Sequence, residues 1–243
     1  MSRKPKQKAP EPKPRVAQHH EYEFIGRDGL GAYSAQPEAF GPERVIYHND
    51  DFVFINDLYP KSTVHCLVLP RDFDKNVLHP FDAFEDAEFL AKVQAEVAKA
   101  RKIVADELRR RYGRFSASER PRIEAMEGDE VPDELPAGRD WAKEVVTGIH
   151  AHPSMNHVHV HVMSRDMVGD CMRHRKHYES FNTPFLVDVD QFPLAKDDSR
   201  RHPGRAGFLD QDLKCWRCGK NFGHKFKRLQ EHLEEEFEKW KRL

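Results

Sequence analysis

The sequence has few cysteines and no long apolar segment. Four of its 243 residues are cysteine, and Cys66 and Cys171 stand alone, which argues against a scaffold held by disulfides and favours a reducing compartment. No apolar run approaches the roughly 20 residues that a membrane-spanning helix needs, and no apolar stretch follows the basic N-terminus as it would in a signal peptide. We therefore expect a soluble protein that is not secreted and has no membrane partner.

The chain also lacks an overall excess of one charge, since its net charge is −1, but its charges are unevenly distributed. Residues 1–20 are rich in proline, lysine and arginine, and we expect them to be a disordered basic arm. This arm is either a solvated tail or a nuclear-localisation or nucleic-acid signal. A second basic stretch, residues 196–228, surrounds a pair of cysteines and is therefore more informative.

Three histidines alternate with three valines between His157 and Val162. In a β-strand, His157, His159 and His161 would line one face and the valines the other. Because imidazole titrates near neutral pH, such a row can offer an unprotonated nucleophile beside protonated groups that stabilise a phosphate. The pattern predicts phosphoryl or nucleotidyl transfer. Zinc binding by the three rings is the rival interpretation, and the upstream Ser154 and the hairpin that carries Asp57 favour a nucleotide instead, through the family resemblance described below.

Residue spacing elsewhere predicts a mixed αβ body. Apolar residues recur at helical spacing from residue 81 to about 112, as one long helix or two abutting ones. Residues 113–140 are acidic and rich in proline and glycine, and we expect a flexible surface insertion there. Strands are predicted at residues 44–48, 51–56, 63–69, 144–150 and 157–164. The first three of these should form an antiparallel meander.

This order of elements, ending in His-x-His-x-His, resembles the histidine triad superfamily of nucleotide hydrolases and transferases. Asp57 and the segments Tyr59–Lys61 and His65–Pro70 are similar to its nucleotide-binding hairpin. Residues 150–157 and 176–183 further resemble the aprataxin family within that superfamily. The resemblance implies an α+β histidine triad fold, with an antiparallel sheet and a long helix, followed by a small C-terminal zinc finger.

The same resemblance suggests domain boundaries. We expect a histidine triad catalytic domain at residues 21–187, a basic linker at 188–211 and a zinc-finger DNA-binding domain at 212–243.

A covalent mechanism is implied by the resemblance. His159 would attack the phosphorus of an adenylate and form a covalent His-AMP that water then hydrolyses. His150 would protonate the leaving phosphate, while His157 and His161 would orient the nucleophile and stabilise charge. No metal is expected at this site. The residues expected to bind the nucleotide are Asp57 at the ribose hydroxyls, Ser154 at a phosphate, and Lys61, His65 and Met155.

The C-terminal region carries a second motif. Cys215, Cys218 and His232 follow the layout of a two-Cys two-His zinc finger that lacks its last histidine. Glu236 lies one helical turn after His232 on the same face, and carboxylate is an accepted zinc ligand. We predict that these four residues bind one structural zinc ion, with water or His224 as the alternative fourth ligand. So small an apolar set would not fold without metal.

Basic residues near both motifs indicate a polynucleotide substrate, because lysine and arginine neutralise phosphates without reading sequence. A solvated charge cluster is the alternative for any one of them. The residues predicted to contact DNA are Lys61, Arg173, Lys176, His177, Arg217 and Lys225.

The resemblance and the finger together predict a monomeric nuclear enzyme, with the cytoplasm as a further location. It would remove AMP from 5′-adenylated DNA nicks or ends left by abortive ligation, in single-strand break repair. One alternative is a nucleoside phosphoramidase or dinucleoside polyphosphate hydrolase, which would need no finger. Another is a DNA-end binding module without catalysis, which would leave His150, Ser154 and His159 unexplained.

Overall fold

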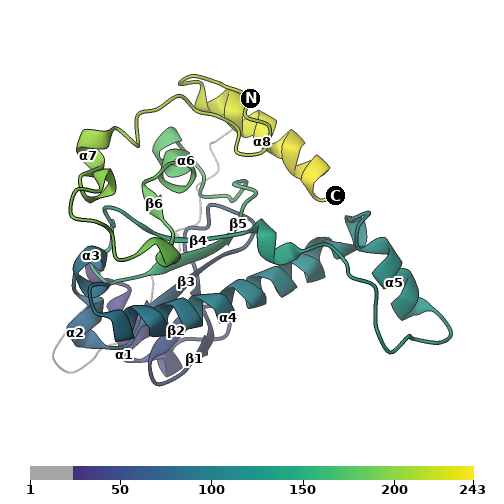
Figure 1. Cartoon of the computed structure of the whole chain (residues 1–243), viewed down its shortest axis with the longest axis horizontal. Coiled ribbons are helices and arrows are strands. Elements are labelled where there is room, and N and C mark those ends of the chain that lie inside the picture. The colour runs from purple at the N-terminus through teal and green to yellow at the C-terminus, as the bar shows by residue number, and fades with distance from the viewer. Residues whose placement is uncertain (1–23) are drawn as a thin grey trace, which may run out of the picture.

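A computed structural model of the chain describes residues 24–243, and the predicted basic arm at residues 1–20 lies outside the described residues. Within that range the strands form one six-stranded antiparallel sheet, in the order β1-β2-β3-β5-β4-β6 (Figure 1). The strands are β1 (Val45–His48), β2 (Phe52–Asn56), β3 (His65–Pro70), β4 (Val145–His150), β5 (Val160–Ser164) and β6 (Leu186–Val187). The predicted α+β fold, with its antiparallel meander, is confirmed.

The helices vary widely in length. The α-helices are α1 (Gly31–Ala35), α2 (Phe73–Asn76), α3 (Pro80–Ala83), α4 (Ala87–Tyr112), α5 (Arg120–Glu127), α6 (Arg175–Asn182), α7 (Pro203–Ala206) and α8 (Phe226–Trp240). Short 3-10 helices are η1 (Gly26–Asp28), η2 (Pro37–Ala39), η3 (Gly113–Phe115), η4 (Trp141–Glu144), η5 (Val189–Gln191) and η6 (Ser199–Arg201). No helix in the described part of the chain combines the length and apolar character needed to span a bilayer.

The helical region predicted from residue 81 is divided into two abutting helices, α3 and α4. The division falls at Asp86, whose carboxylate accepts hydrogen bonds from the backbone N–H groups of Glu88 and Phe89. Such an N-cap satisfies donors that have no partner within the helix, so it sets the start of α4. From there α4 runs along one face of the sheet (Figure 1).

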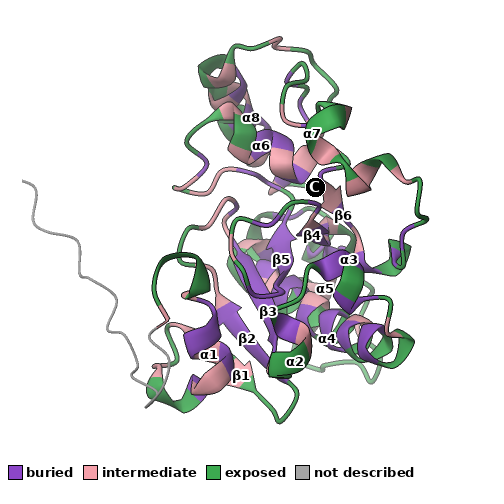
Figure 2. Cartoon of the chain, turned by 90° about the vertical axis from the view of Figure 1, so that its left-hand side faces the viewer, coloured by how far each residue is buried: buried purple, intermediate pink, exposed green. Residues whose placement is uncertain are grey.

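Alternating side chains give the sheet two different faces. Val160 and Val162 of β5 pack with Val93 and Val97 of α4 in the main core. The opposite face of β5 carries His161, which is level with Leu67 of β3. That face is covered by α1 at one end of the sheet and by α6 and the C-terminal region at the other (Figures 1 and 2). The histidines are thus held on the face that α4 does not cover.

Strand β5 begins three residues later than predicted. It starts at Val160, so that His161 lies in the strand while His157 and His159 lie in the segment before it. Pairing with β3 runs out at Val160, because the N–H of Val158 donates instead to the carbonyl of Asn76 in α2 (2.6 Å). The predicted division of faces nonetheless holds for Val158, which is buried in the main core.

The acidic segment 113–140 folds as η3, α5 and a connecting loop, where the sequence predicts a flexible insertion. Residues near its start are attached to distant parts of the chain. Backbone N–H groups of Ala117 and Ser118 donate to carbonyls of Arg242 and Leu243. At the core side, the Glu119 carboxylate is 2% exposed and accepts from the indole Nε1 of Trp141 (2.7 Å). These partners lie too far away in the sequence to be seen from its composition.

The end of α8 is built into the main core. Trp240 is 1% exposed and meets Trp141 edge to face. Its Nε1 donates to Glu144 (2.6 Å), and the Arg139 guanidinium lies over both indole rings. The C-terminal end of α8 is therefore fixed to the body.

We predict that Trp240→Ala lowers the free energy of unfolding by about 3–5 kcal/mol, because it leaves a cavity and removes the indole hydrogen bond to the Glu144 carboxylate. Urea unfolding of the full chain at neutral pH measures this loss. Met126→Ala on α5 is the control, because that side chain is 54% exposed and should change stability by less than about 0.5 kcal/mol. Equal effects of the two substitutions would show that α8 is not fixed through Trp240.

Candidate active site and metal centre

Four imidazole rings converge between β3, β4 and β5. The ring centroid of His161 lies 4.6 Å from that of His150 and 5.1 Å from those of His65 and His159. His65, His159 and His161 are at most 6% exposed. Phe181 of α6 packs against His65, His150 and His161 and closes the cluster on one side. The cluster was predicted in part, but no sequence pattern pointed to Phe181.

The ring of His159 is held so that Nε2 is its unprotonated nitrogen. Its Nδ1 lies 2.7 Å from the backbone carbonyl of His157, and because a carbonyl can only accept, Nδ1 must carry the proton. The lone pair of the ring is then on Nε2. Burial lowers the pKa of His159, which favours the neutral ring at pH 7 and an available lone pair on Nε2.

A chain of hydrogen bonds fixes the proton positions of His65 and His161. The backbone N–H of Lys61 donates to Nδ1 of His65 (3.1 Å), so the proton of His65 is on Nε2. That Nε2 faces both Nδ1 of His161 (2.9 Å) and the carboxylate of Asp57 (3.3 Å). His161 therefore accepts at Nδ1 and carries its own proton on Nε2. In the described residues this buried Nε2 has no partner, and neither does Nε2 of His150.

These unpartnered nitrogens favour a ligand with oxygen atoms. A buried polar group without a partner costs about 1–3 kcal/mol, and such groups are rare outside functional sites. Phosphoryl oxygens would satisfy the N–H group of His161 directly.

His157 contributes through its backbone rather than its ring. The ring lies beside Phe24, at 6.0 Å between centroids. A Cβ atom at Gly31 would come within 2.6 Å of Nε2 of His157, so the first turn of α1 fits closely over this ring. The carbonyl of His157 accepts from His159, and the orienting role of His157 stays a prediction.

The predicted nucleotide-binding residues fall into two groups. The Asp57 carboxylate accepts from the N–H of Tyr59 (2.7 Å) and reaches His65, while the Lys61 ammonium donates to the Tyr59 carbonyl. Met155 is half-buried and packs on the small core beneath α1. Ser154 is exposed. Asp57, Lys61 and His65 thus form one group, and Ser154 and Met155 lie in the segment between β4 and β5.

The segment before α1 contacts the segment between β4 and β5. No sequence pattern indicated this contact. The side chain of Asn156 donates to Asp28 (2.7 Å), and its backbone N–H donates to the carbonyl of Arg27 (3.0 Å). Residues just before α1 therefore help to hold the segment that precedes His157.

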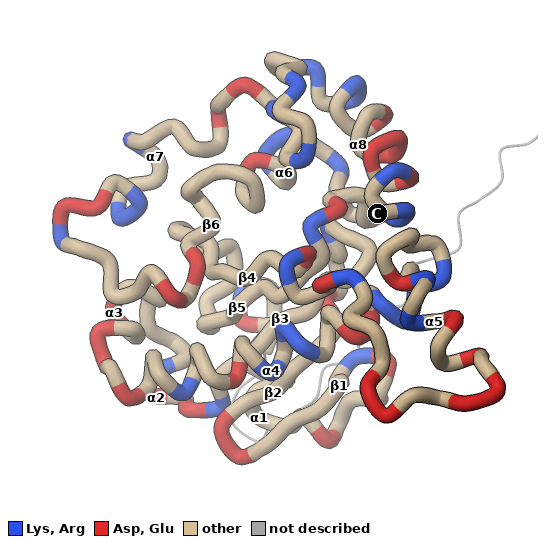
Figure 3. Tube along the Cα trace, turned by 45° about the vertical axis from the view of Figure 1, so that its right-hand side comes forward, with Lys and Arg blue, Asp and Glu red and all other residues tan. Residues whose placement is uncertain are grey.

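The residues predicted to contact DNA differ in their exposure and in whether another side chain already binds them. Arg173 and Lys176 are exposed near α6, and Lys225 is exposed at the start of α8. Figure 3 shows Lys and Arg around α6 and along the approach to α8. His177 is half-buried, and its Nδ1 accepts from the N–H of Arg173 (3.2 Å). Arg217 is different, since its guanidinium pairs with Glu236 (2.5 Å).

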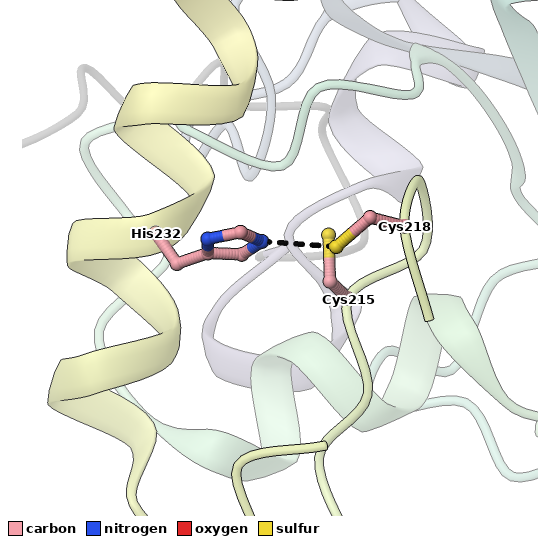
Figure 4. Close-up of side chains that lie close together, drawn as sticks. All are labelled: Cys215, Cys218 and His232. Carbon is pink, nitrogen blue, oxygen red and sulfur yellow. Dashed lines mark hydrogen bonds between the residues drawn. The ribbon is translucent and has the colours of Figure 1, made fainter. Parts of the chain in front are cut away.

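Three of the four predicted metal ligands lie together (Figure 4). The ligand atoms of Cys215, Cys218 and His232 are all within 4.8 Å of one another, and Sγ of Cys218 is 3.1 Å from Nε2 of His232. Gly219 has a φ of +73°, which lets the chain turn tightly after Cys218. The N–H of Cys215 donates to the carbonyl of Lys220 and closes this turn. Two thiolates and an imidazole are a donor set that fits structural Zn²⁺.

Glu236 lies on the same side of α8 but its carboxylate is engaged elsewhere. It is 5% exposed and pairs with Arg217 (2.5 Å) and Lys239 (2.6 Å). Its role as the fourth ligand stays a prediction. The alternative ligand is His224. Its Nδ1 lies 2.5 Å from a guanidinium nitrogen of Arg175. Helical spacing places Glu236 on the correct face, but the arginine contributed by the cysteine turn decides where its carboxylate points.

We predict that Glu236→Ala weakens zinc binding at least about tenfold, because it removes a ligand. Competition with a chromogenic chelator measures the affinity. Glu234→Ala is the matched control, since this residue is exposed in the same acidic run of α8 and its loss should leave the affinity unchanged. Unaltered affinity in Glu236→Ala would mean that this carboxylate only pairs with Arg217 and Lys239.

The buried histidines should make the protein less stable in mild acid. Burial lowers the pKa of His65 to about 4 and that of His150 to about 3, from 6.5. The unfolded chain binds these protons near pH 6.5, whereas the folded chain binds them only near pH 3–4. The free energy of unfolding should therefore be constant above about pH 7 and fall below it, by up to about 1.4 kcal/mol per pH unit for each histidine.

Urea unfolding between about pH 5 and pH 7 tests this slope, in a range above the titration of most carboxylates. His150→Asn should make the slope shallower, whereas the same substitution at the exposed His48 should not. A flat profile in the unsubstituted protein would contradict the neutral, buried state of the cluster.

Comparison with known proteins agrees with this geometry. A profile of the HIT domain matches residues 39–168, and a profile of the C2HE / C2H2 / C2HC zinc-binding finger matches residues 182–239. The chain is similar to the aprataxin-like protein of Schizosaccharomyces pombe, with 33% identity over 88% of this chain and 82% of that protein. It is also similar to the aprataxin-like protein of Saccharomyces cerevisiae, with 34% identity over 87% of this chain and 95% of that protein.

A solved structure matches as well. The crystal structure of the aprataxin ortholog Hnt3 in complex with DNA superimposes with a TM-score of 0.68 and 30% sequence identity, covering 88% of this chain and 96% of that chain. The finger profile, together with the cluster of Cys215, Cys218 and His232, indicates a structural zinc. The chain therefore belongs to the aprataxin-like family of HIT-domain proteins that carry a C-terminal zinc-binding finger.

Proposed function

We propose that the protein is a DNA deadenylase that hydrolyses the 5′-5′ pyrophosphate of adenylated DNA ends left by abortive ligation. Its products would be AMP and DNA with a 5′-phosphate. The observation that carries the proposal is a preoriented His159 nucleophile in a body to which the finger is firmly docked.

The chemistry would proceed in two displacements. Nε2 of His159 attacks the phosphorus of the AMP group, the bond from that phosphorus to the bridging oxygen breaks, and the DNA leaves with its 5′-phosphate. Water then attacks the phosphorus of the His159–AMP, which releases AMP and restores the neutral ring. The N–H on Nε2 of His161 is available to hold a non-bridging oxygen in both steps.

His150 is the group best placed to move the proton. Burial holds its pKa near 3, which favours the neutral ring before substrate binds. A phosphate that enters beside it brings negative charge, and nearby negative charge raises the pKa of a histidine. The ring could then donate a proton to the leaving oxygen and recover one from the attacking water.

DNA as the leaving group is supported by the surroundings of the site. Hnt3, the structural neighbour, is in complex with DNA. In the present chain, the exposed Arg173, Lys176 and Lys225 lie on α6 or its approach and at the start of α8, where phosphates along a strand can be neutralised. A small dinucleotide would not need this extended basic surface.

We expect His159→Ala to lower the rate of AMP release from a nicked duplex with a 5′-adenylate by at least about a thousandfold, because no other residue replaces the nucleophile. Gel separation of adenylated and phosphorylated strands measures the rate. His48→Ala, an exposed histidine outside the cluster, is the control and should retain full activity. AMP release by His159→Ala at the unsubstituted rate would exclude the covalent route.

The same assay separates the alternatives. Equal kcat/KM on the adenylated nick and on a diadenosine polyphosphate would favour a small-molecule hydrolase of the same superfamily. Binding of the nicked duplex without turnover of either substrate would favour a DNA-end binding module.

A further inference from the structure

Helix α6 contacts both the histidine cluster and the finger. Phe181 packs its ring against His150 at 4.7 Å and against His161 at 5.0 Å between centroids. One turn earlier, Tyr178 is 2% exposed and belongs to an apolar cluster that also contains Cys215 and Leu229 of the finger. Neither of these contacts involves the proposed DNA surface.

The Tyr178 hydroxyl forms hydrogen bonds on both sides of Cys215, one of the predicted metal ligands. It donates to the carbonyl of Lys214 (2.7 Å) and accepts from the backbone N–H of Trp216 (2.9 Å). These are the residues on either side of Cys215. A phenolic hydroxyl can donate and accept at once, so this one atom holds both peptide groups that flank the cysteine.

Further hydrogen bonds hold α6 to the segment that precedes the finger, at residues 210–211. The Glu179 carboxylate, 1% exposed, accepts from the N–H of Gln211 (2.8 Å). The Arg175 guanidinium donates to the carbonyl of Gln211 (2.8 Å) and pairs with Asp210 (3.1 Å). An isolated helix of eight residues is not stable in water, so α6 depends on these contacts for its position.

We propose that Tyr178 is a positioning residue that holds the Cys215 side of the zinc centre on α6, and that α6 and Phe181 transmit zinc occupancy to the histidine cluster. Zinc fixes the thiolate of Cys215, and with it the two peptide groups that the Tyr178 hydroxyl binds. Loss of zinc would release these groups, loosen α6 and withdraw the packing of Phe181. The inference rests on zinc binding at the finger and not on the deadenylation reaction.

Tyr178→Phe removes only the hydroxyl and keeps the ring in its apolar surroundings. We expect zinc to be released from the full-length protein to a chromogenic chelator about tenfold faster, which corresponds to about 1.4 kcal/mol. Tyr47→Phe is the matched control, because it removes a half-buried hydroxyl that bonds to Glu96 of α4, away from the finger. Equal release rates in Tyr178→Phe and Tyr47→Phe would overturn the positioning role.

Hydrogen exchange tests the transmission without any enzymatic readout. In the unsubstituted protein, removal of zinc should speed the exchange of the backbone amides of α6 at least about tenfold, while the amides of β2 remain protected. In Tyr178→Phe, the amides of α6 should already exchange faster with zinc bound, so that removal of zinc adds less. Exchange in α6 that is the same with and without zinc would refute the transmission.

A second variant separates the two ends of the helix. Phe181→Leu reduces the packing on the histidines but leaves the Tyr178 hydroxyl bonds in place. We expect unchanged zinc release and a raised pKa of the cluster histidines, measured by NMR titration, because solvent enters beside them. Faster zinc release in Phe181→Leu, at the rate of Tyr178→Phe, would show that α6 only contributes general stability.

Discussion

Four imidazole rings share a space that Phe181 and the sheet shield from solvent, and His150 is the most exposed of the four. In that space a ring nitrogen that lacks a hydrogen bond to the protein is costly unless a ligand supplies one. The Lys61 N–H and the His157 carbonyl settle the proton positions of His65 and His159. The remaining nitrogens are Nε2 of His150, His159 and His161, and in the proposed mechanism they act on the phosphoryl group. Preorganised groups of this kind need no rearrangement when charge develops on a phosphoryl oxygen.

The same burial explains why the C-terminal region cannot be treated as an independent module. Its apolar side chains Leu213, Leu229 and Leu233 share one cluster with Met163 of β5 and with Tyr178 of α6. Trp240, at the other end of α8, is part of the main core. The finger is thus attached at two points, which fixes its orientation relative to the histidines. A bound polymer could then be held by both parts without the cost of ordering two mobile domains.

Acidic and basic residues lie in different regions of the surface. The acidic residues of α5 and its loop project from one end of the molecule, while lysines and arginines gather around α6 and the approach to α8 (Figure 3). The segment with α5 is fastened at Glu119 to Trp141 and at Ser118 to Leu243. A net charge near zero therefore conceals a surface with distinct acidic and basic regions, and long-range attraction depends on such regions rather than on the total.

The sequence by itself determined the features that depend on local geometry. Period-two alternation placed Val160 and Val162 opposite His161, and helical spacing placed His232 and Glu236 on one face of α8, because both periods follow from backbone dihedrals. The tertiary structure alone decided which atoms meet. His65 and His161 are 96 residues apart and exchange a hydrogen bond, and no local pattern encodes such a partner. For the same reason only the fold shows that the His157 ring turns to α1, that Phe181 closes the cluster and that Tyr178 grips the chain around Cys215.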